Sequence, residues 1–207
     1  MPKIVDHEQR RSEIVRALWQ MIATHGVEGV SLREVAQAAE VSIGRIQHYF
    51  DSREALVLAG LERLIAQARA AYEETASSSP RDRLLHVLVQ QVPRSELGRI
   101  GVTVWYAYLA TAITDRRIRE VLAEALRGGE TECATHVAAL RGIDNVEARA
   151  VARRLLALSD GLTLRVLVDG LDPDDAIAIL RAEVDTGDQA AKSRVLRPVR
   201  SGRETWR

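Results

Sequence analysis

The sequence has very little cysteine, few aromatic residues and no long apolar run. Cys133 is the single cysteine among 207 residues and cannot form a disulfide within the chain. Residues 1–15 contain no apolar signal core and no small-residue cleavage site. The longest uncharged run, residues 100–114, is shorter than the roughly 20 residues of a membrane-spanning helix. These absences predict a cytoplasmic protein.

The sequence also lacks a net charge and lacks the common catalytic motifs. Its 29 basic residues balance 29 acidic ones, which weighs mildly against a nucleic-acid-binding protein, although the distribution of charge matters more than the sum. There is no glycine-rich phosphate loop and no nucleophile elbow. Cys133 and His136 are too few ligands for a metal site and are better explained as structural residues. We therefore predict no enzyme, no metal and no cofactor.

Apolar residues recur at helical spacing, and no segment alternates between apolar and polar residues as a strand would. Capping residues mark helix starts, and glycines mark several helix ends. The pattern predicts an all-α protein of about nine helices over roughly residues 6–25, 32–40, 42–50, 52–75, 80–92, 97–114, 116–139, 145–170 and 173–186. The Gly128–Gly129 pair either kinks or splits the seventh helix.

Residues 31–50 contain two start signals for short helices. Ser31 and Glu34 form a capping box, so a helix should begin at Leu32, and Ser42 should cap a second helix that buries Ile46 and Phe50. Two brief helices joined by a tight turn predict a helix-turn-helix, whose second helix enters the DNA major groove. A local basic patch brackets this second helix and consists of Arg10, Arg11, Arg33, Arg45 and Arg53.

The same stretch resembles a known family. VSIGRIQHYF over residues 41–50, followed by DSREAL over residues 51–56, looks like the V-S-x-G-x-[LI]-Y-x-[HY]-F-x-[ST]-[KR]-E-x-L signature of TetR-family transcriptional regulators. Gln47 replaces the usual tyrosine, as in the BetI-like branch, and DGL at residues 160–162 with Leu164 and Arg165 is similar to that branch's eighth helix. The resemblance implies a DNA-binding domain at 1–52 and an effector-binding and dimerisation domain at 53–186. Residues 187–207 lose the apolar periodicity and gather basic residues, which predicts a basic, disordered tail.

The third helix supplies the residues that we expect to contact DNA. Arg45 and Gln47 can make bidentate contacts to base edges, and Gly44 lets the backbone approach DNA closely. The resemblance places Tyr49, Ser31 and Arg53 at phosphates and Arg33 at a position that reads a base in some members. The alternative is that these are solvated helix residues, and for Arg33 the two readings have equal weight. The full predicted set is Ser31, Arg33, Ser42, Ile43, Gly44, Arg45, Gln47, His48, Tyr49 and Arg53.

Aromatic residues gather in the sixth helix, where the resemblance implies an effector cavity. Aromatic faces with a nearby carboxylate would suit an organic cation, although an aromatic compound or plain core packing would also explain the cluster. The predicted effector residues are Trp105, Tyr106, Leu109, Glu130, Cys133 and Asp160, with Tyr108 in the same cluster.

One recognition helix reads only a few base pairs, so such a domain needs a two-fold dimer on a palindromic site. The last two helices carry apolar stripes that we expect to serve both the dimer interface and the subunit's own core: Ala157, Leu158, Gly161, Leu162, Arg165, Ile177 and Leu180. The preferred hypothesis is a repressor released from its operator by a small molecule. An activator, or an all-helical small-molecule binding protein or enzyme with no DNA role, is the alternative. The basic tail either adds non-specific DNA affinity or is only disordered.

Overall fold

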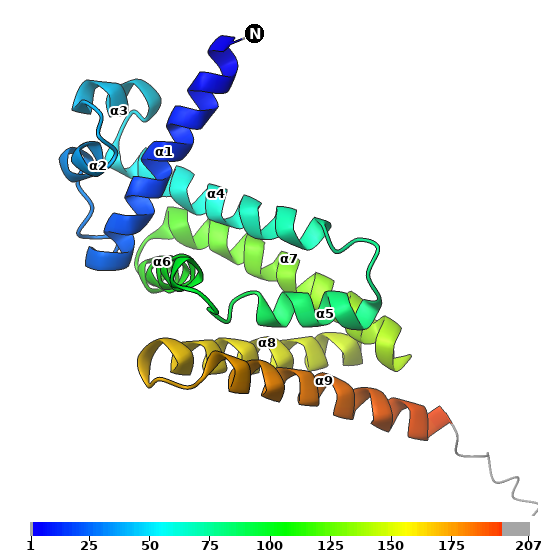
Figure 1. Cartoon of the computed structure of the whole chain (residues 1–207). Coiled ribbons are helices and arrows are strands. Elements are labelled where there is room, and N and C mark those ends of the chain that lie inside the picture. Colours follow the sequence, from blue (N-terminus) through cyan, green and yellow to red (C-terminus); the bar gives the residue numbers. More distant parts are fainter. Residues whose placement is uncertain (1, 196–207) are drawn as a thin grey trace, which may run out of the picture.

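The computed structural model describes the backbone of residues 2–195 and the side chains of residues 7–186. This part of the chain contains nine α-helices and no strand, which confirms the predicted all-α fold (Figure 1). The helices are α1 Pro2–His25, α2 Leu32–Ala38, α3 Ile43–Tyr49, α4 Arg53–Glu73, α5 Pro80–Val89, α6 Glu96–Ala112, α7 Arg116–Arg141, α8 Asn145–Val168 and α9 Pro173–Val195. Among the described residues, no helix is long and apolar enough to cross a bilayer.

Side-chain caps set where most of the helices begin. The hydroxyl of Ser79 accepts from the backbone N–H of Asp82 at the start of α5, and Pro80 takes the first helical position, where its missing N–H costs nothing. Asp144 accepts from two backbone amides at the start of α8. These starts agree with the sequence prediction, because capping depends on residues only three positions apart.

For α7 the structure decides between the predicted alternatives, and for α9 it corrects a predicted boundary. α7 runs without interruption through Gly128–Gly129, so the glycine pair does not split it. α9 continues to Val195, past the boundary that we predicted at residue 186. The first nine residues of the predicted tail, 187–195, are therefore helical, and residues 196–207 lie outside the described part of the chain.

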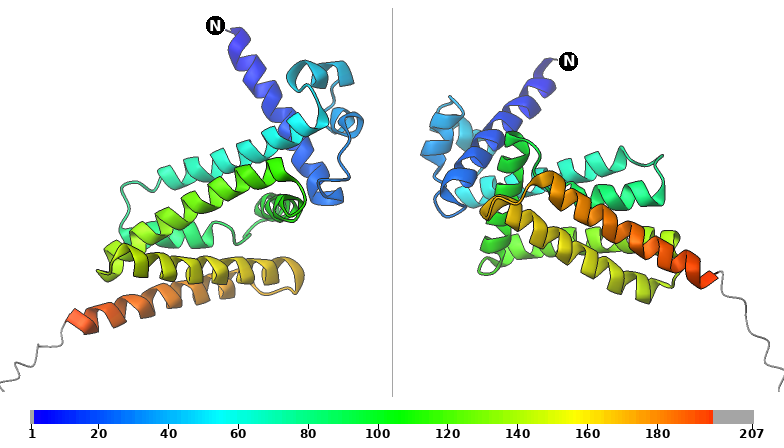
Figure 2. Two further views of the ribbon diagram at one scale, coloured as in Figure 1. Left: turned by 180° about the vertical axis from the view of Figure 1, so that it is seen from behind. Right: turned by 60° about the horizontal axis from the view of Figure 1, so that its bottom comes forward.

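The helices are arranged so that the two ends of the molecule differ. α1, α2 and α3 form one end, while α8 and α9 lie side by side at the opposite end (Figures 1 and 2). α4 starts beside the first three helices and extends away from them toward α5. α4 is thus the covalent link between the two ends.

The buried side chains form two clusters that do not follow the predicted domain boundary at residue 52. One cluster joins α1–α4 to buried residues of α6 and the start of α7, including Val104, Tyr108 and Leu122. The other joins α5, the second half of α7, α8 and α9. The N-terminal helices therefore share their core with α6 and α7.

Gly60 lets three helices of the first cluster meet closely. A Cβ atom at this position of α4 would lie 2.5 Å from Cδ2 of Leu18 in α1 and 2.8 Å from the hydroxyl oxygen of Tyr108 in α6. The indole N–H of Trp19 donates to the Gly60 carbonyl at 3.2 Å, and the Tyr108 hydroxyl donates to the Val57 carbonyl at 2.8 Å. Both hydrogen bonds satisfy side-chain polar groups that would otherwise be buried without partners.

Replacing Gly60 with alanine should destabilise the fold. The added methyl group has no room between α1 and α6, and overpacking of this kind costs about 1–3 kcal/mol. Urea unfolding followed by circular dichroism measures the change. Gly129→Ala is the matched control, because a Cβ there meets no atom within 4 Å and alanine is the better helix former. Equal stability of the two variants would contradict the tight junction at Gly60.

Candidate nucleic-acid interface

Hydrogen bonds fix both ends of α2, the helix that precedes the turn to α3. The Ser31 hydroxyl accepts from the Glu34 amide at 3.2 Å and donates to the Glu34 carboxylate at 2.7 Å, so the predicted capping pair forms. At the other end of α2, Glu40 adopts a left-handed conformation with φ 53°, and the Val41 N–H donates to the Ala36 carbonyl. This is the pattern of a Schellman motif, which ends a helix sharply.

α3 begins immediately after this turn and has one face buried. The Ser42 hydroxyl accepts from the Arg45 amide at 3.2 Å, as the sequence predicted. Ile46 is fully buried, and Phe50, the residue that ends the helix, is 3% exposed. The opposite face carries Ser42, Ile43, Gly44, Arg45, Gln47 and His48, all of which are exposed. Polar and cationic groups on this face can form hydrogen bonds with base edges in a major groove.

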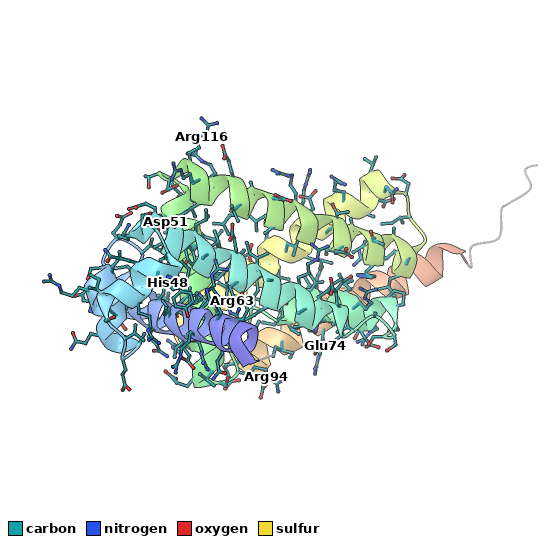
Figure 3. The ribbon with its side chains drawn as sticks, turned by 90° about the horizontal axis from the view of Figure 1, so that it is seen from above. His48, Asp51, Arg63, Glu74, Arg94 and Arg116 are labelled. Atoms are coloured by element: carbon teal, nitrogen blue, oxygen red, sulfur yellow. The ribbon has the colours of Figure 1, made fainter. Side chains whose placement is uncertain are left out.

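The predicted phosphate and flanking contacts lie in different surroundings. Arg33 of α2 is exposed, whereas Ser31 and Tyr49 are half-buried. The Tyr49 ring lies against the ring of His48, with the two centroids 5.2 Å apart. Figure 3 shows His48 at the end of the molecule formed by α1–α3, far from Glu74 at the end of α4.

The Arg53 guanidinium group, which the resemblance places at a phosphate, forms hydrogen bonds within the chain. Its Nε donates to the Val30 carbonyl at 2.7 Å, and a terminal nitrogen donates to the Val27 carbonyl. The third nitrogen lies 3.8 Å from the Glu54 carboxylate. Arg53 therefore ties the start of α4 to the loop between α1 and α2, and only sequence-distant contacts reveal this role.

The predicted effector residues do not converge on one site. Trp105 and Leu109 of α6 pack against the N-terminal cluster, and Tyr108 is fully buried there. The Tyr106 hydroxyl donates to the backbone carbonyl of Asp160 in α8 at 2.8 Å, and burial raises the pKa of Tyr106 to about 12. This hydrogen bond brings together two of the predicted effector residues, Tyr106 and Asp160.

Glu130 and Cys133 of α7 belong to other surroundings. Glu130 pairs with Arg153 at 3.0 Å and with Arg149 at 3.6 Å, and the hydrogen bond from Arg153 lowers the pKa of Glu130. Cys133 is fully buried in the second cluster, where burial raises its pKa to about 12. A thiol with so high a pKa is neutral and unreactive at physiological pH. No group of three potential metal ligands occurs among the described residues.

Two hollows lie elsewhere on the surface. One of about 660 Å³ is bounded by α1, the end of α2, α4 and the start of α6, and its lining includes Trp19 and Leu97. The other, of about 380 Å³, lies between the start of α6 and the α8–α9 turn and is lined in part by Arg99 and Leu171. None of the six predicted effector residues lines either hollow.

A polar cluster between α4, α5 and α7 was not predicted from the sequence. The Tyr72 hydroxyl donates to Glu132 at 2.7 Å and lies 2.6 Å from Nε2 of His136. Because a hydroxyl carries one proton, Nε2 of His136 must be the donor in the second contact. The guanidinium group of Arg83 lies 4.4 Å from the centre of the Tyr72 ring. Tyr72 lies 60 and 64 positions from Glu132 and His136 in the sequence, so no short-range motif links it to these partners.

The predicted dimer residues divide between the core and the surface. Leu162, Ile177 and Leu180 are buried in the second cluster, and Leu158 packs partly against it. Ala157, Gly161 and Arg165 are exposed on α8, and Arg165 forms an ion pair with Asp169 at 2.9 Å. Exposed apolar side chains that were not predicted as interface residues also lie on α8 and α9, among them Leu164, Val168 and Ile179.

A capped helix-turn-helix with an exposed polar second helix, joined to a larger helical bundle, defines a DNA-binding transcriptional regulator. Comparison with known proteins identifies the family. Residues 14–59 match the family model of bacterial regulatory proteins of the tetR family, and residues 80–188 match the C-terminal domain of BetI-type transcriptional repressors. The chain belongs to the TetR family, which confirms the predicted family, its BetI-like branch and the prediction of a regulator rather than an enzyme.

Similar proteins cover most of the chain. The HTH-type transcriptional regulator BetI of Burkholderia mallei is 31% identical over 94% of this chain and 100% of its own length. The HTH-type regulator PksA of Bacillus subtilis is 30% identical over 82% of this chain and 84% of its own length. A solved TetR-family regulator from Rhodococcus sp. superposes with a TM-score of 0.77 at 27% identity, over 87% of this chain and 99% of that one.

Replacing Arg53 should test whether its role is structural. Arg53→Lys keeps the positive charge but loses the fork that reaches two carbonyl groups, so we expect a loss of about 1–3 kcal/mol of stability in urea unfolding. Arg33→Lys is the control, because Arg33 is exposed on the neighbouring helix. If Arg53→Lys leaves the stability unchanged and Arg53→Ala lowers only the affinity for DNA, Arg53 serves as a phosphate contact and not as a structural residue.

Proposed function

We propose that the chain is a repressor that binds a palindromic operator as a dimer and is released by a small-molecule effector. The exposed ridge of Arg45, Gln47 and His48 on α3 carries this proposal, because Ile46 and Phe50 hold the same helix from beneath. Arginine recognises guanine and glutamine recognises adenine through paired hydrogen bonds in the major groove. Gly44 lies at the start of α3, where the absence of a side chain allows close approach to the DNA backbone.

A dimer would place two such ridges on successive turns of the DNA. The outer stripe of α8 supports this part of the proposal, since Ala157, Gly161, Leu164 and Val168 recur at intervals of three and four residues and are all exposed. Val168 is 77% exposed, and Ile179 adds an apolar group on α9. Small residues beside larger apolar ones let two helix pairs pack closely across a two-fold axis.

An organic cation is the effector class that we propose. Tyr106 and the half-buried Trp105 belong to α6, and the backbone carbonyl of the exposed Asp160 in α8 accepts the hydrogen bond from Tyr106. The surrounding protein desolvates the Asp160 carboxylate and raises its pKa, so a cation placed beside it would be favoured. A regulator from Saccharomonospora viridis was solved in complex with choline and superposes with a TM-score of 0.77, over 86% of this chain and 96% of that one. Its sequence is 24% identical, so the likeness concerns the fold alone.

The effector would act by favouring one arrangement of the helices over another. α4 touches α1 and α6 at Gly60, and its far end is tied to α7 through Tyr72. A ligand that binds better when α6 and α7 are displaced shifts the population toward that state, and α4 transmits the shift to α1–α3. DNA affinity falls when the two recognition helices no longer match the spacing of the half-sites.

The Arg45→Ala, Gln47→Ala double variant tests the DNA-reading face. Each lost base contact should cost about 1–3 kcal/mol of discrimination, measured by mobility shift on the DNA upstream of the gene. Arg116→Ala is the control, because Arg116 projects from the start of α7, on a different part of the surface (Figure 3). Unchanged binding by the double variant, or binding by the wild type that ignores salt concentration, would favour a helical protein with no DNA role.

Thermal-shift measurements with choline and with its uncharged carbon analogue test the effector class. A cation at 100 times its dissociation constant should stabilise the protein by about 2.7 kcal/mol, and Asp160→Asn should reduce this gain. Asp169→Asn, at the residue that follows α8, is the matched control. Stabilisation by neutral aromatic compounds alone would end the cation hypothesis.

A further inference from the structure

One face of α1 continues beyond the hydrophobic core and reaches the recognition helix. The buried residues Ile14, Leu18 and Ile22 recur every four residues on this face. A step of three residues from Ile14 toward the N-terminus leads to Arg11, and a further step of four leads to His7; residues three and four apart share one side of a helix. These two side chains lie where the apolar core has ended and the DNA-facing surface begins.

His7 and Arg11 contact the last turn of α3. The His7 ring lies 4.5 Å from the Tyr49 ring, centre to centre, and 6.2 Å from the His48 ring. One turn along α1, the guanidinium group of Arg11 lies 5.3 Å from the centre of the Phe50 ring. Two successive turns of α1 therefore contact His48 and Tyr49 at the end of α3 and Phe50 directly after it.

We propose that His7 and Arg11 are positioning residues for DNA recognition, and we call this pair the α1 brace. The inference rests on the DNA-binding role of α3 but adds residues that lie outside the helix-turn-helix. α3 has only seven residues, and Ile46 is its single buried side chain. A helix this short is not stable alone, so contacts from neighbouring elements decide its orientation.

The brace would act on the two residues of α3 that it touches. His48 is exposed and Tyr49 is half-buried, and both belong to the predicted DNA-contacting set. Contacts between aromatic rings contribute about 0.5–1.5 kcal/mol, and an exposed cation–π contact contributes about 0.5–1 kcal/mol. Losing the His7 contact should therefore weaken operator binding about twofold to tenfold, because α3 must then be ordered when DNA binds.

The test compares His7→Ala and His7→Phe with the wild type. A DNA duplex is first selected from random sequences with the wild-type protein, and dissociation constants are then measured on that duplex at several salt concentrations. Failure of the wild type to select any sequence would reject the DNA-binding function itself. Gln9→Ala is the matched control, since Gln9 is a neutral exposed residue two positions along α1 whose amide donates to Glu13 of the same helix.

We expect His7→Ala to raise the dissociation constant about twofold to tenfold and His7→Phe to restore it to the wild-type value. The dependence on salt should be the same for all variants, because a ring that positions α3 releases no counterions. In a Tyr49→Ala background, His7→Ala should have little further effect, as expected for residues that act through one contact.

Two results would overturn the α1 brace. If His7→Phe binds as weakly as His7→Ala and both have a shallower salt dependence, His7 contacts DNA directly. If His7→Ala binds like Gln9→Ala, the contact with Tyr49 does not position α3. Melting temperatures of all variants, measured without DNA, separate these outcomes from loss of folding.

Discussion

The close approach of α1, α4 and α6 at Gly60 is the constraint on which the rest of the structure depends. At this point the side chain of Leu18 and the hydroxyl of Tyr108 occupy the space that any larger residue would fill. The hydrogen bonds from Trp19 and Tyr108 to α4 carbonyls lie in the same place. Because the packed interior cannot deform smoothly, a displacement of α6 must move α4 or α1 with it. The DNA-facing end and the helical bundle are thereby mechanically joined.

Polar contacts also connect the two ends of α4 to neighbouring elements. At its first turn, Arg53 reaches the carbonyls of the α1–α2 loop, and near its last turn Tyr72 forms hydrogen bonds with α7. Each of these side chains also has some exposure to water, so their contacts can exchange more readily than those around Gly60. α4 is therefore held firmly near its middle and more loosely at its ends, as a switching element requires.

The features that could be predicted from the sequence are those governed by neighbouring residues. Ser31, Ser42 and Ser79 each cap a helix through an amide three positions away, so their roles are visible in the sequence itself. The exposed face of α3 follows in the same way from the burial of Ile46 and Phe50. The contacts that Arg53 and Tyr72 make within the chain were not predicted, because their partners are distant in sequence. Helical periodicity identifies a buried stripe, but it does not reveal which element covers that stripe. Leu162 and Ile177, which we expected to serve both the dimer interface and the subunit's own core, pack within the subunit.

The position of Cys133 has a practical consequence for experiments that follow displacements of α4 and α6. Cys133 is sealed within the second cluster, and its thiol stays protonated because burial raises its pKa to about 12. Maleimide and other thiol reagents attack the thiolate, so the native protein offers them almost no target. A fluorophore or spin label can therefore be attached to a single cysteine introduced on the surface, with the natural one left in place.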